Sequence, residues 1–277
     1  MHFKDEGQGG RHEGSQAACL TESVVFSVVT CVSDPDLLQK TLGASVRESA
    51  GAPAELIAID NSDSQYSAPQ ALNLGADQAH GAVLVFLHQD VLLPPGWFGR
   101  LSQQIQTVEE TFGPWGVLGV FGVTSWGKMV GHINDPHGYR RWGALPCRVQ
   151  SLDEVCLVVR RDSGLGFDEQ LGGFHFYGAD LCLQARQRGA SCYAIDACLE
   201  HLSGGRKDAR FWEVAGRFEA KWRNVPGSPS AIATTCGIFR TQAGTEAVCI
   251  QALSGLQRKM WHRLQRVAGT GRGGRTL

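Results

Sequence analysis

Five apolar runs along the chain have the length of buried strands. The five runs are residues 24–32, 55–60, 82–87, 155–159 and 192–195. Their apolar residues are continuous rather than alternating with polar ones, and most runs are rich in Val, Ile and Leu. Runs of this kind are typical of strands that are covered on both faces, as in a parallel sheet. The pattern therefore predicts a central sheet that lies between two layers.

Helical periodicity fills the segments between these runs. Leu38, Leu42 and Val46 recur at a spacing of four behind Asp34, which predicts a helix with Asp34 as its N-cap. Further helices are predicted over 69–80, from 95 to about 108, over 178–188 and over 211–222. Strands and helices thus alternate, which predicts a doubly wound α/β sheet. In such sheets ligands bind beyond the carboxyl ends of the strands.

Other segments lack this alternation. Residues 1–22 and 268–277 are polar and glycine-rich, and we expect both to be disordered. Residues 113–148 are rich in Gly, Trp and His and are expected to form an irregular, functional loop. A basic last helix is expected over 246–266.

Composition excludes several classes of protein. A net charge of −1 provides no basic field for nucleic acid. The nine cysteines include no Cys-x-x-Cys pair, so reduced core thiols are a better interpretation than disulfides or a zinc site. No signal peptide is visible, and the longest apolar stretch, 114–126, is shorter than a membrane span of ~18 residues. We therefore expect a cytoplasmic location, with a peripheral membrane contact of the basic helix left open.

Two acids stand where predicted strands end. Asp90 closes the segment His88-Gln89-Asp90, where a carboxylate either holds a divalent cation against a diphosphate or caps a turn. Asp60 precedes Asn61-Ser62, and it either accepts hydrogen bonds from a nucleotide or forms an Asx-turn. The residues alone leave both alternatives open.

Two more residues carry candidate chemistry in the second half of the chain. Asp180 lies in the first turn of helix 178–188, where it either complements the helix dipole or acts as a general base. His201, before Leu202-Ser203-Gly204-Gly205, is either structural or a metal ligand.

Taken in order, these segments resemble a family 2 glycosyltransferase of the GT-A fold, from about Phe26 to about Gly205. The resemblance rests on an ordered set of motifs: Phe26-Ser27-Val28-Val29-Thr30, Glu55-Leu56-Ile57-Ala58-Ile59-Asp60-Asn61-Ser62, Asn73-Leu74-Gly75-Ala76, His88-Gln89-Asp90, Gly166-Phe167-Asp168-Glu169, Tyr177-Gly178-Ala179-Asp180-Leu181-Cys182-Leu183 and His201-Leu202-Ser203-Gly204-Gly205. Residues 174–180 are most similar to the branch named for streptomycin-biosynthesis-like proteins. The resemblance implies a nucleotide-sugar-binding and catalytic GT-A domain over 23–206, with a mainly parallel sheet flanked by helices. A helical extension would follow over 207–267.

The resemblance also implies ligands and roles. The donor would be a nucleoside-diphosphate sugar, with UDP the first choice, and the acceptor would be a hydroxyl of a glycan or small molecule. Asp90 and His201 would bind Mn²⁺ or Mg²⁺, and Asp180 would be the catalytic base of an inverting transfer. The remaining residues would contact the nucleotide: Thr30, Val32, Asp60, Asn61, His88 and Gln89.

The sequence departs from the family pattern at two positions. His88 stands in place of the usual first acid of the D-x-D motif, and Ala179 in place of the acid that often precedes Asp180. A non-catalytic nucleotide- or sugar-binding protein on the same fold is therefore the alternative function. A nucleotidyltransferase is disfavoured, because residues 30–35 contain no glycine-rich phosphate loop with Lys or Arg. Four aromatic residues of the 113–148 segment are expected either on the acceptor side or against the core: Trp115, Trp126, Tyr139 and Trp142.

Overall fold

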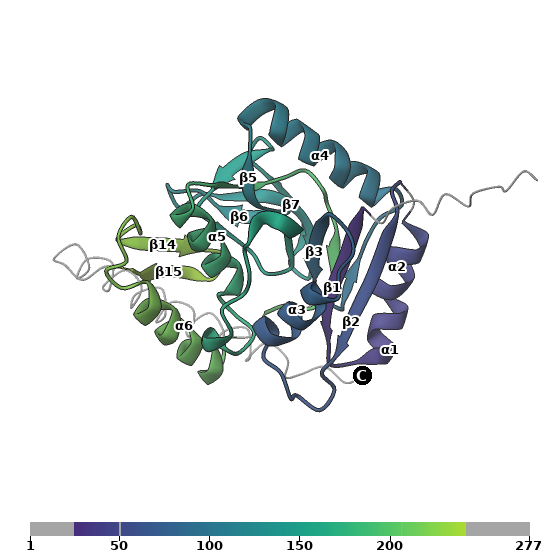
Figure 1. The fold of residues 1–277 in the computed structure, drawn as a ribbon, viewed down its shortest axis with the longest axis horizontal. Helices are drawn as coiled ribbons and strands as arrows, with labels where there is room; N and C mark the ends of the chain where they lie inside the picture. Colours follow the sequence, from purple (N-terminus) through teal and green to yellow (C-terminus); the bar gives the residue numbers. More distant parts are fainter. Residues whose placement is uncertain (1–24, 50, 206, 242–277) are drawn as a thin grey trace, which may run out of the picture.

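The computed structural model describes residues 25–49, 51–205 and 207–241, so the predictions for 1–22, 246–266 and 268–277 lie outside the described residues. A seven-stranded sheet forms the centre, with helices on both faces (Figure 1). Its strands, in sheet order, are β2 (Ala54–Asp60), β1 (Phe26–Val32), β3 (Val83–Leu87), β11 (Cys156–Arg160), β5 (Trp115–Gly119), β12 (Ser191–Ala194) and β9 (Cys147–Val149).

The central sheet is mainly parallel, as the sequence predicts. β1 pairs in parallel with both β2 and β3, and β5 pairs in parallel with β12. β11 lies antiparallel between β3 and β5, so these two strands share one direction, and β9 is antiparallel to β12. Only β11 and β9 therefore run against the other strands of this sheet, and the predicted α/β class is confirmed.

Both faces of the sheet are covered by helices. One face carries α1 (Pro35–Lys40), α2 (Leu42–Glu48) and α4 (Trp97–Phe112), and the other carries α3 (Ala68–Asp77) and α5 (Tyr177–Gln187). Val28 packs in one core cluster with Phe98 of α4, whereas Val29 packs in the other with Leu72 of α3. Because successive side chains of a strand point to opposite faces, burial on both faces requires the continuous apolar runs seen in the sequence. Asp34 accepts a hydrogen bond from the Leu37 amide at 3.0 Å, which confirms it as the N-cap of α1.

A second sheet lies across the carboxyl end of the first. It contains β10 (Ser151–Leu152), β6 (Phe121–Val123), β7 (Met129–Asp135), β13 (Glu200–His201) and β4 (Val91–Leu92), and β8 (Gly138–Trp142) pairs with β7. Much of the segment 113–148, which we expected to be irregular, is therefore strand. These strands are short, and glycines at turns such as Gly127 and Gly138 separate them, so the sequence shows no sustained period.

The C-terminal part packs against α5. Helix α6 (Ala209–Trp222) is followed by an antiparallel hairpin of β14 (Ala231–Thr234) and β15 (Gly237–Arg240), at the left of Figure 1. Phe176, Phe218 and Phe239 join these elements in a third core cluster. The expected extension over 207–267 is thus helix and hairpin as far as the described residues reach. The described residues also include two short 3-10 helices, η1 (Arg161–Ser163) and η2 (Glu169–Leu171). Among the described residues no helix combines the length and the apolar character that a membrane span requires.

Candidate metal centre

Strand pairing between distant segments builds the candidate site. β3 ends at Leu87, and His88-Gln89-Asp90 forms the turn into β4. β4 pairs with β13, which places His201 opposite Val91, and the Leu202 amide donates to the Asp90 carbonyl at 3.1 Å. The structure therefore brings the two predicted metal ligands, Asp90 and His201, together across 111 residues of chain.

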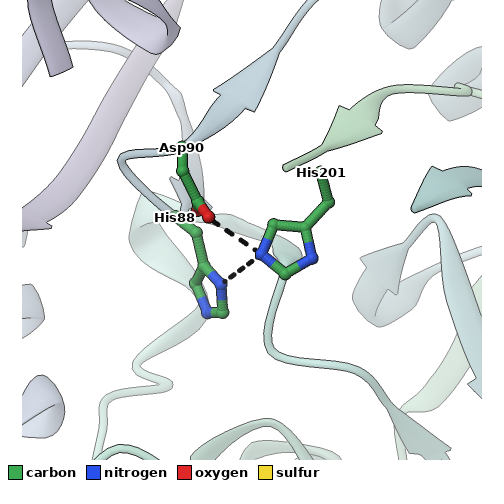
Figure 2. Close-up of side chains that lie close together, drawn as sticks. All are labelled: His88, Asp90 and His201. Carbon is green, nitrogen blue, oxygen red and sulfur yellow. Dashed lines mark hydrogen bonds and ion pairs between the residues drawn. The ribbon is translucent and has the colours of Figure 1, made fainter. Parts of the chain in front are cut away.

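Three side chains converge at this turn, as Figure 2 shows. Nε2 of His201 lies 3.4 Å from Oδ1 of Asp90 and 3.2 Å from Nδ1 of His88. One potential ligand atom of each residue lies within 4.8 Å of the others. Adjacent ligand atoms of an octahedral divalent ion are about 3 Å apart, so this spacing suits one ion. Two imidazoles and a carboxylate fit Mn²⁺ better than Ca²⁺.

Burial and hydrogen bonding keep His88 and Asp90 in the forms that bind a cation. Burial, and then the neighbouring His201, lower the pKa of His88 to about 4, so its ring is neutral near pH 7. Burial on its own would raise the pKa of Asp90, but hydrogen bonds from His201 and Ser203 outweigh it and hold that pKa well below its usual range. The Tyr177 hydroxyl lies 3.1 Å from Nε2 of His88 and orients the ring.

A cavity of about 260 Å³ opens beside this centre. It lies at the carboxyl ends of β1 and β3, where α/β sheets place their ligands. Gln89 bridges its wall, because its Oε1 accepts from the amides of Ser33 and Asp34 at 2.9 and 3.0 Å. The lining residues are Cys31, Ser33, Ala68, Leu72, Phe86, Leu87, His88, Gln89, Asp90, Glu154, Phe174, His175, Tyr177 and Ser203.

Two predicted nucleotide contacts on β1, Thr30 and Val32, do not line this cavity, and their contacts with a nucleotide stay predictions. Thr30 is fully buried, and Val32 belongs to the core cluster beneath α4. The alternate positions, Cys31 and Ser33, line the cavity. This alternation follows from the period of two in a strand.

The segment after β2 forms a hydrogen-bonded loop. Asp60 is exposed, and its Oδ1 accepts from the amide of Ser62 at 2.9 Å and from its hydroxyl at 2.6 Å, which also lowers the Asp60 pKa. Asn61 is buried, and its side chain donates to the Tyr66 carbonyl and accepts from the Tyr66 amide. The Asx-turn left open by the sequence is present, and nucleotide contacts of Asp60 and Asn61 stay predictions.

Asp180 is separate from the metal centre. It is 1% exposed and does not line the cavity. Its Oδ1 accepts from Nε1 of Trp222 at 2.7 Å and lies 2.7 Å from Nζ of Lys221, while its Oδ2 accepts from Gln184 at 2.8 Å. These contacts join α5 to α6, and the catalytic role of Asp180 stays a prediction.

Glu154 lines the cavity, although the sequence provided no signal for it. It stands between β10 and β11, and an acid before an apolar run is typical of an ordinary turn. Burial, and then the neighbouring Asp153, raise the pKa of Glu154 to about 8. A perturbed carboxyl in a cavity is a candidate for acid–base chemistry.

The four aromatic residues of the 113–148 segment divide into two kinds. Trp115 is buried in β5, and Trp142 packs on the ring of Phe121. Trp126 and Tyr139 are 89% and 67% exposed. None of the four contributes to the cavity lining, so the structure leaves an acceptor role for them untested.

Comparison with known proteins identifies relatives by sequence and by fold. No protein-family model matches the chain. The Fuscovulum blasticum protein "ATP synthase subunits region ORF 6" is 33% identical over 216 residues, which cover 74% of this chain and 86% of that protein. The O-antigen biosynthesis protein RfbC of Myxococcus xanthus is 26% identical over 226 residues, which cover 69% of this chain but only 17% of RfbC.

The solved structure of GalNAc-T7 with UDP, GalNAc and Mn²⁺ matches with a TM-score of 0.50 and 13% identity. The match covers 71% of this chain and 48% of that chain, so the protein spans about half the length of this structural relative. At this identity the likeness shows the fold alone, which is that of the GT-A glycosyltransferases.

Proposed function

We propose that this chain, which belongs to the same family as the Fuscovulum blasticum protein, is a glycosyltransferase that uses a nucleoside-diphosphate sugar. The observation that carries the proposal is the convergence of His88, Asp90 and His201 beside a cavity at the carboxyl edge of a GT-A sheet. The GalNAc-T7 structure contains UDP and Mn²⁺, and RfbC is named for O-antigen biosynthesis; both facts support the proposal.

The metal-binding role falls to Asp90 and His201, with His88 as the third donor. A divalent ion held there would offset the negative charge that develops on a departing diphosphate. Two imidazoles favour Mn²⁺ over Mg²⁺, which prefers an all-oxygen shell. His88 is neutral near pH 7, so a ring nitrogen can offer its lone pair to the ion.

The nucleotide is proposed to enter along the β1 side of the cavity. Cys31 and Ser33 line that side, and Gln89 holds the Ser33 backbone in place. Asp60 stays the candidate for base or ribose contact, because it ends β2 at the same sheet edge. UDP is the first nucleotide to test.

Several finer assignments belong to the same proposal. They are the inverting outcome, the streptomycin-biosynthesis-like branch, the catalytic domain over 23–206, the hydroxyl acceptor on a glycan or small molecule and the cytoplasmic location. The first four rest on the sequence resemblance, and the location rests on the expectation stated from the sequence pattern.

Thermal unfolding with nucleotides tests the proposal. We expect UDP or another nucleoside diphosphate, at about 100 times its Kd with Mn²⁺, to stabilise the protein by about 2.7 kcal/mol. For a domain of this size that corresponds to a Tm increase of about 5–10 °C. Asp90→Asn keeps the side-chain shape but removes the charge, and the Mn²⁺-dependent part of the shift should disappear.

A matched control separates site effects from general charge effects. Asp162 is an exposed acid that follows β11 at the opposite edge of the sheet, so Asp162→Asn should leave the Mn²⁺-dependent shift intact. The proposal fails if none of UDP, GDP, ADP, CDP and dTDP raises the Tm of the wild type, with or without Mn²⁺.

The non-catalytic binding protein is the second candidate. The observation in its favour is that Asp180, the predicted base, is engaged by Trp222 and Lys221 away from the cavity. This candidate predicts a nucleotide-dependent Tm increase together with background release of UDP from UDP-sugars.

A further inference from the structure

Glu154 is a carboxylate that lines the same cavity as the metal centre. It comes from the connection between β10 and β11 and lies beneath the N-terminus of α5, where its Oε1 accepts from the Gly178 amide at 3.4 Å. It shares the cavity lining with His88, Asp90 and Tyr177. The lining of one cavity thus contains both the metal-binding residues and a further carboxylate.

The contacts of Glu154 differ in kind from those of Asp180. Backbone amides, those of Glu154 itself, Gly178 and Phe176, supply the hydrogen bonds that favour the ionised form of Glu154. Asp180 instead contacts an ammonium group, an indole and an amide within 2.8 Å. Both oxygens of Asp180 are thus occupied within the contact between α5 and α6, and Asp180 does not line the cavity.

We propose that Glu154, rather than Asp180, takes the proton from the acceptor hydroxyl. The inference rests on the proposed function. In the step, the acceptor oxygen forms its bond to the anomeric carbon as the bond from that carbon to the diphosphate oxygen breaks, and its electron pair leaves with the diphosphate. The hydroxyl proton moves to a Glu154 oxygen and passes to solvent when the product leaves.

The surroundings of Glu154 suit a proton acceptor. Burial and Asp153 raise its pKa to about 8, and a general base works best when its pKa lies near the operating pH. The other titratable groups that face it are Tyr177 and Cys182 of α5 and Cys236 of the β14–β15 turn, and burial raises the pKa of each. His175 also lines the cavity, and burial lowers its pKa. These shifts keep Tyr177, Cys182, Cys236 and His175 neutral near pH 7. The neighbouring charge that raises the pKa of Glu154 is therefore that of Asp153.

A purely structural role for Glu154 makes different predictions. A carboxylate at a helix N-terminus stabilises the helix by its charge and its hydrogen bond to the amide. Glu154→Gln keeps an oxygen for the Gly178 amide, so a structural role predicts full turnover in a folded variant. A proton acceptor cannot be replaced by an amide.

The test measures two quantities on the full-length chain: the Tm increase with UDP and Mn²⁺, and the release of UDP from UDP-sugars. The donor is the one of UDP-glucose, UDP-galactose, UDP-GlcNAc and UDP-GalNAc that wild type turns over fastest, with water or an added sugar as acceptor. We expect Glu154→Gln to keep the Tm increase and to lose about 10²–10⁴-fold in kcat. Formate added to Glu154→Ala should restore part of the rate, and Asp180→Asn, corrected for its folded fraction, should retain turnover.

The outcomes distinguish this inference from the proposed function. A folded Glu154→Gln within threefold of the wild-type kcat overturns the inference and leaves the glycosyltransferase standing. The inference is also overturned if folded Asp180→Asn loses turnover while Glu154→Gln does not. A wild type without a nucleotide-dependent Tm increase and without UDP release overturns the proposed function, and the inference with it. If Glu154→Gln does not fold, Glu154→Asp replaces it in the test. This variant should retain a measurable rate, and its activity should rise with pH.

Discussion

Asp180 offers the sharpest test of how the structure assigns roles to acids. In the sequence it is either a catalytic base or a structural carboxylate, and in the structure it is 1% exposed between α5 and α6. Asp180→Asn preserves the shape of the side chain. It removes the negative charge and replaces one hydrogen-bond-accepting oxygen with an NH₂ donor. We expect this variant to lose stability rather than chemistry.

The contacts set the magnitude. The asparagine oxygen can still accept from Nε1 of Trp222. Its NH₂ group would then face Nε2 of Gln184, so two hydrogen-bond donors would oppose each other. Lys221 would lose one of its charged partners. A lost charge-assisted hydrogen bond costs about 1.5–3 kcal/mol, and an unsatisfied buried donor costs about 1–3 kcal/mol. Lys221 is 28% exposed and keeps Asp168 at 2.7 Å, which reduces the total. We predict a loss of about 2–4 kcal/mol in the free energy of unfolding.

Urea unfolding followed by tryptophan fluorescence measures this loss. Scanning calorimetry should show a Tm lower by roughly 5–15 °C. The matched control is Asp168→Asn, which removes the other, more exposed partner of Lys221 and should cost less than about 1 kcal/mol. If Asp180→Asn unfolds within about 0.5 kcal/mol of wild type and its turnover is abolished, the structural assignment is wrong.

Three further predictions follow from other contacts. Tyr177→Phe removes the hydroxyl that orients His88, so Mn²⁺ affinity, measured by titration of the Tm, should fall about 10–100-fold, and an unchanged affinity would contradict the orienting role. The folded-state pKa of Glu154 lies above its ordinary value, so its contribution to stability is present below about pH 4.5 and is lost as pH rises through about 8. The Tm of Glu154→Gln relative to wild type should therefore rise between pH 5 and pH 9, by about 3 °C or more, and a constant difference would refute the burial argument. Gly75→Ala places a Cβ 2.3 Å from Cγ1 of Val29 and should destabilise by about 1–3 kcal/mol in urea, whereas Gly216→Ala, with open space around its Cβ, should be neutral or stabilising.

The sequence predicts the central layers well because their cause is local. Burial on both faces requires aliphatic residues at every position, so β1, β3 and β11 are visible as continuous runs. Asp34 is predicted as an N-cap because capping involves only the next few residues. By contrast, β6, β8 and the β14–β15 hairpin are short and only partly apolar, and pairing with distant partners decides their form.

For the candidate site, the residue types are visible in the chain but their assembly is not. Asp90 and His201 are identified by resemblance, and the pairing of β4 with β13 brings them together. Neighbouring residues of β1 face opposite sides of the sheet, so a shift of one position moves a side chain from the core to the cavity. Cys31 and Ser33 line the cavity, whereas Thr30 and Val32, which were expected to contact the nucleotide, are buried. No local pattern indicates which residues of a strand end face a ligand.

The sequence by itself determined the α/β class, the order of strands β1, β2, β3, β11 and β12 and of the helices that cover them, and the position of an acid at the end of β3. These depend on side-chain periodicity and on caps, which act over a few residues. Only the tertiary structure decided that His88 and His201 share one centre with Asp90, that Asp180 is held by α6 and that Glu154 faces the cavity. Those outcomes depend on contacts between segments tens of residues apart, and folding brings such segments together through the whole pattern of strand pairing and core packing.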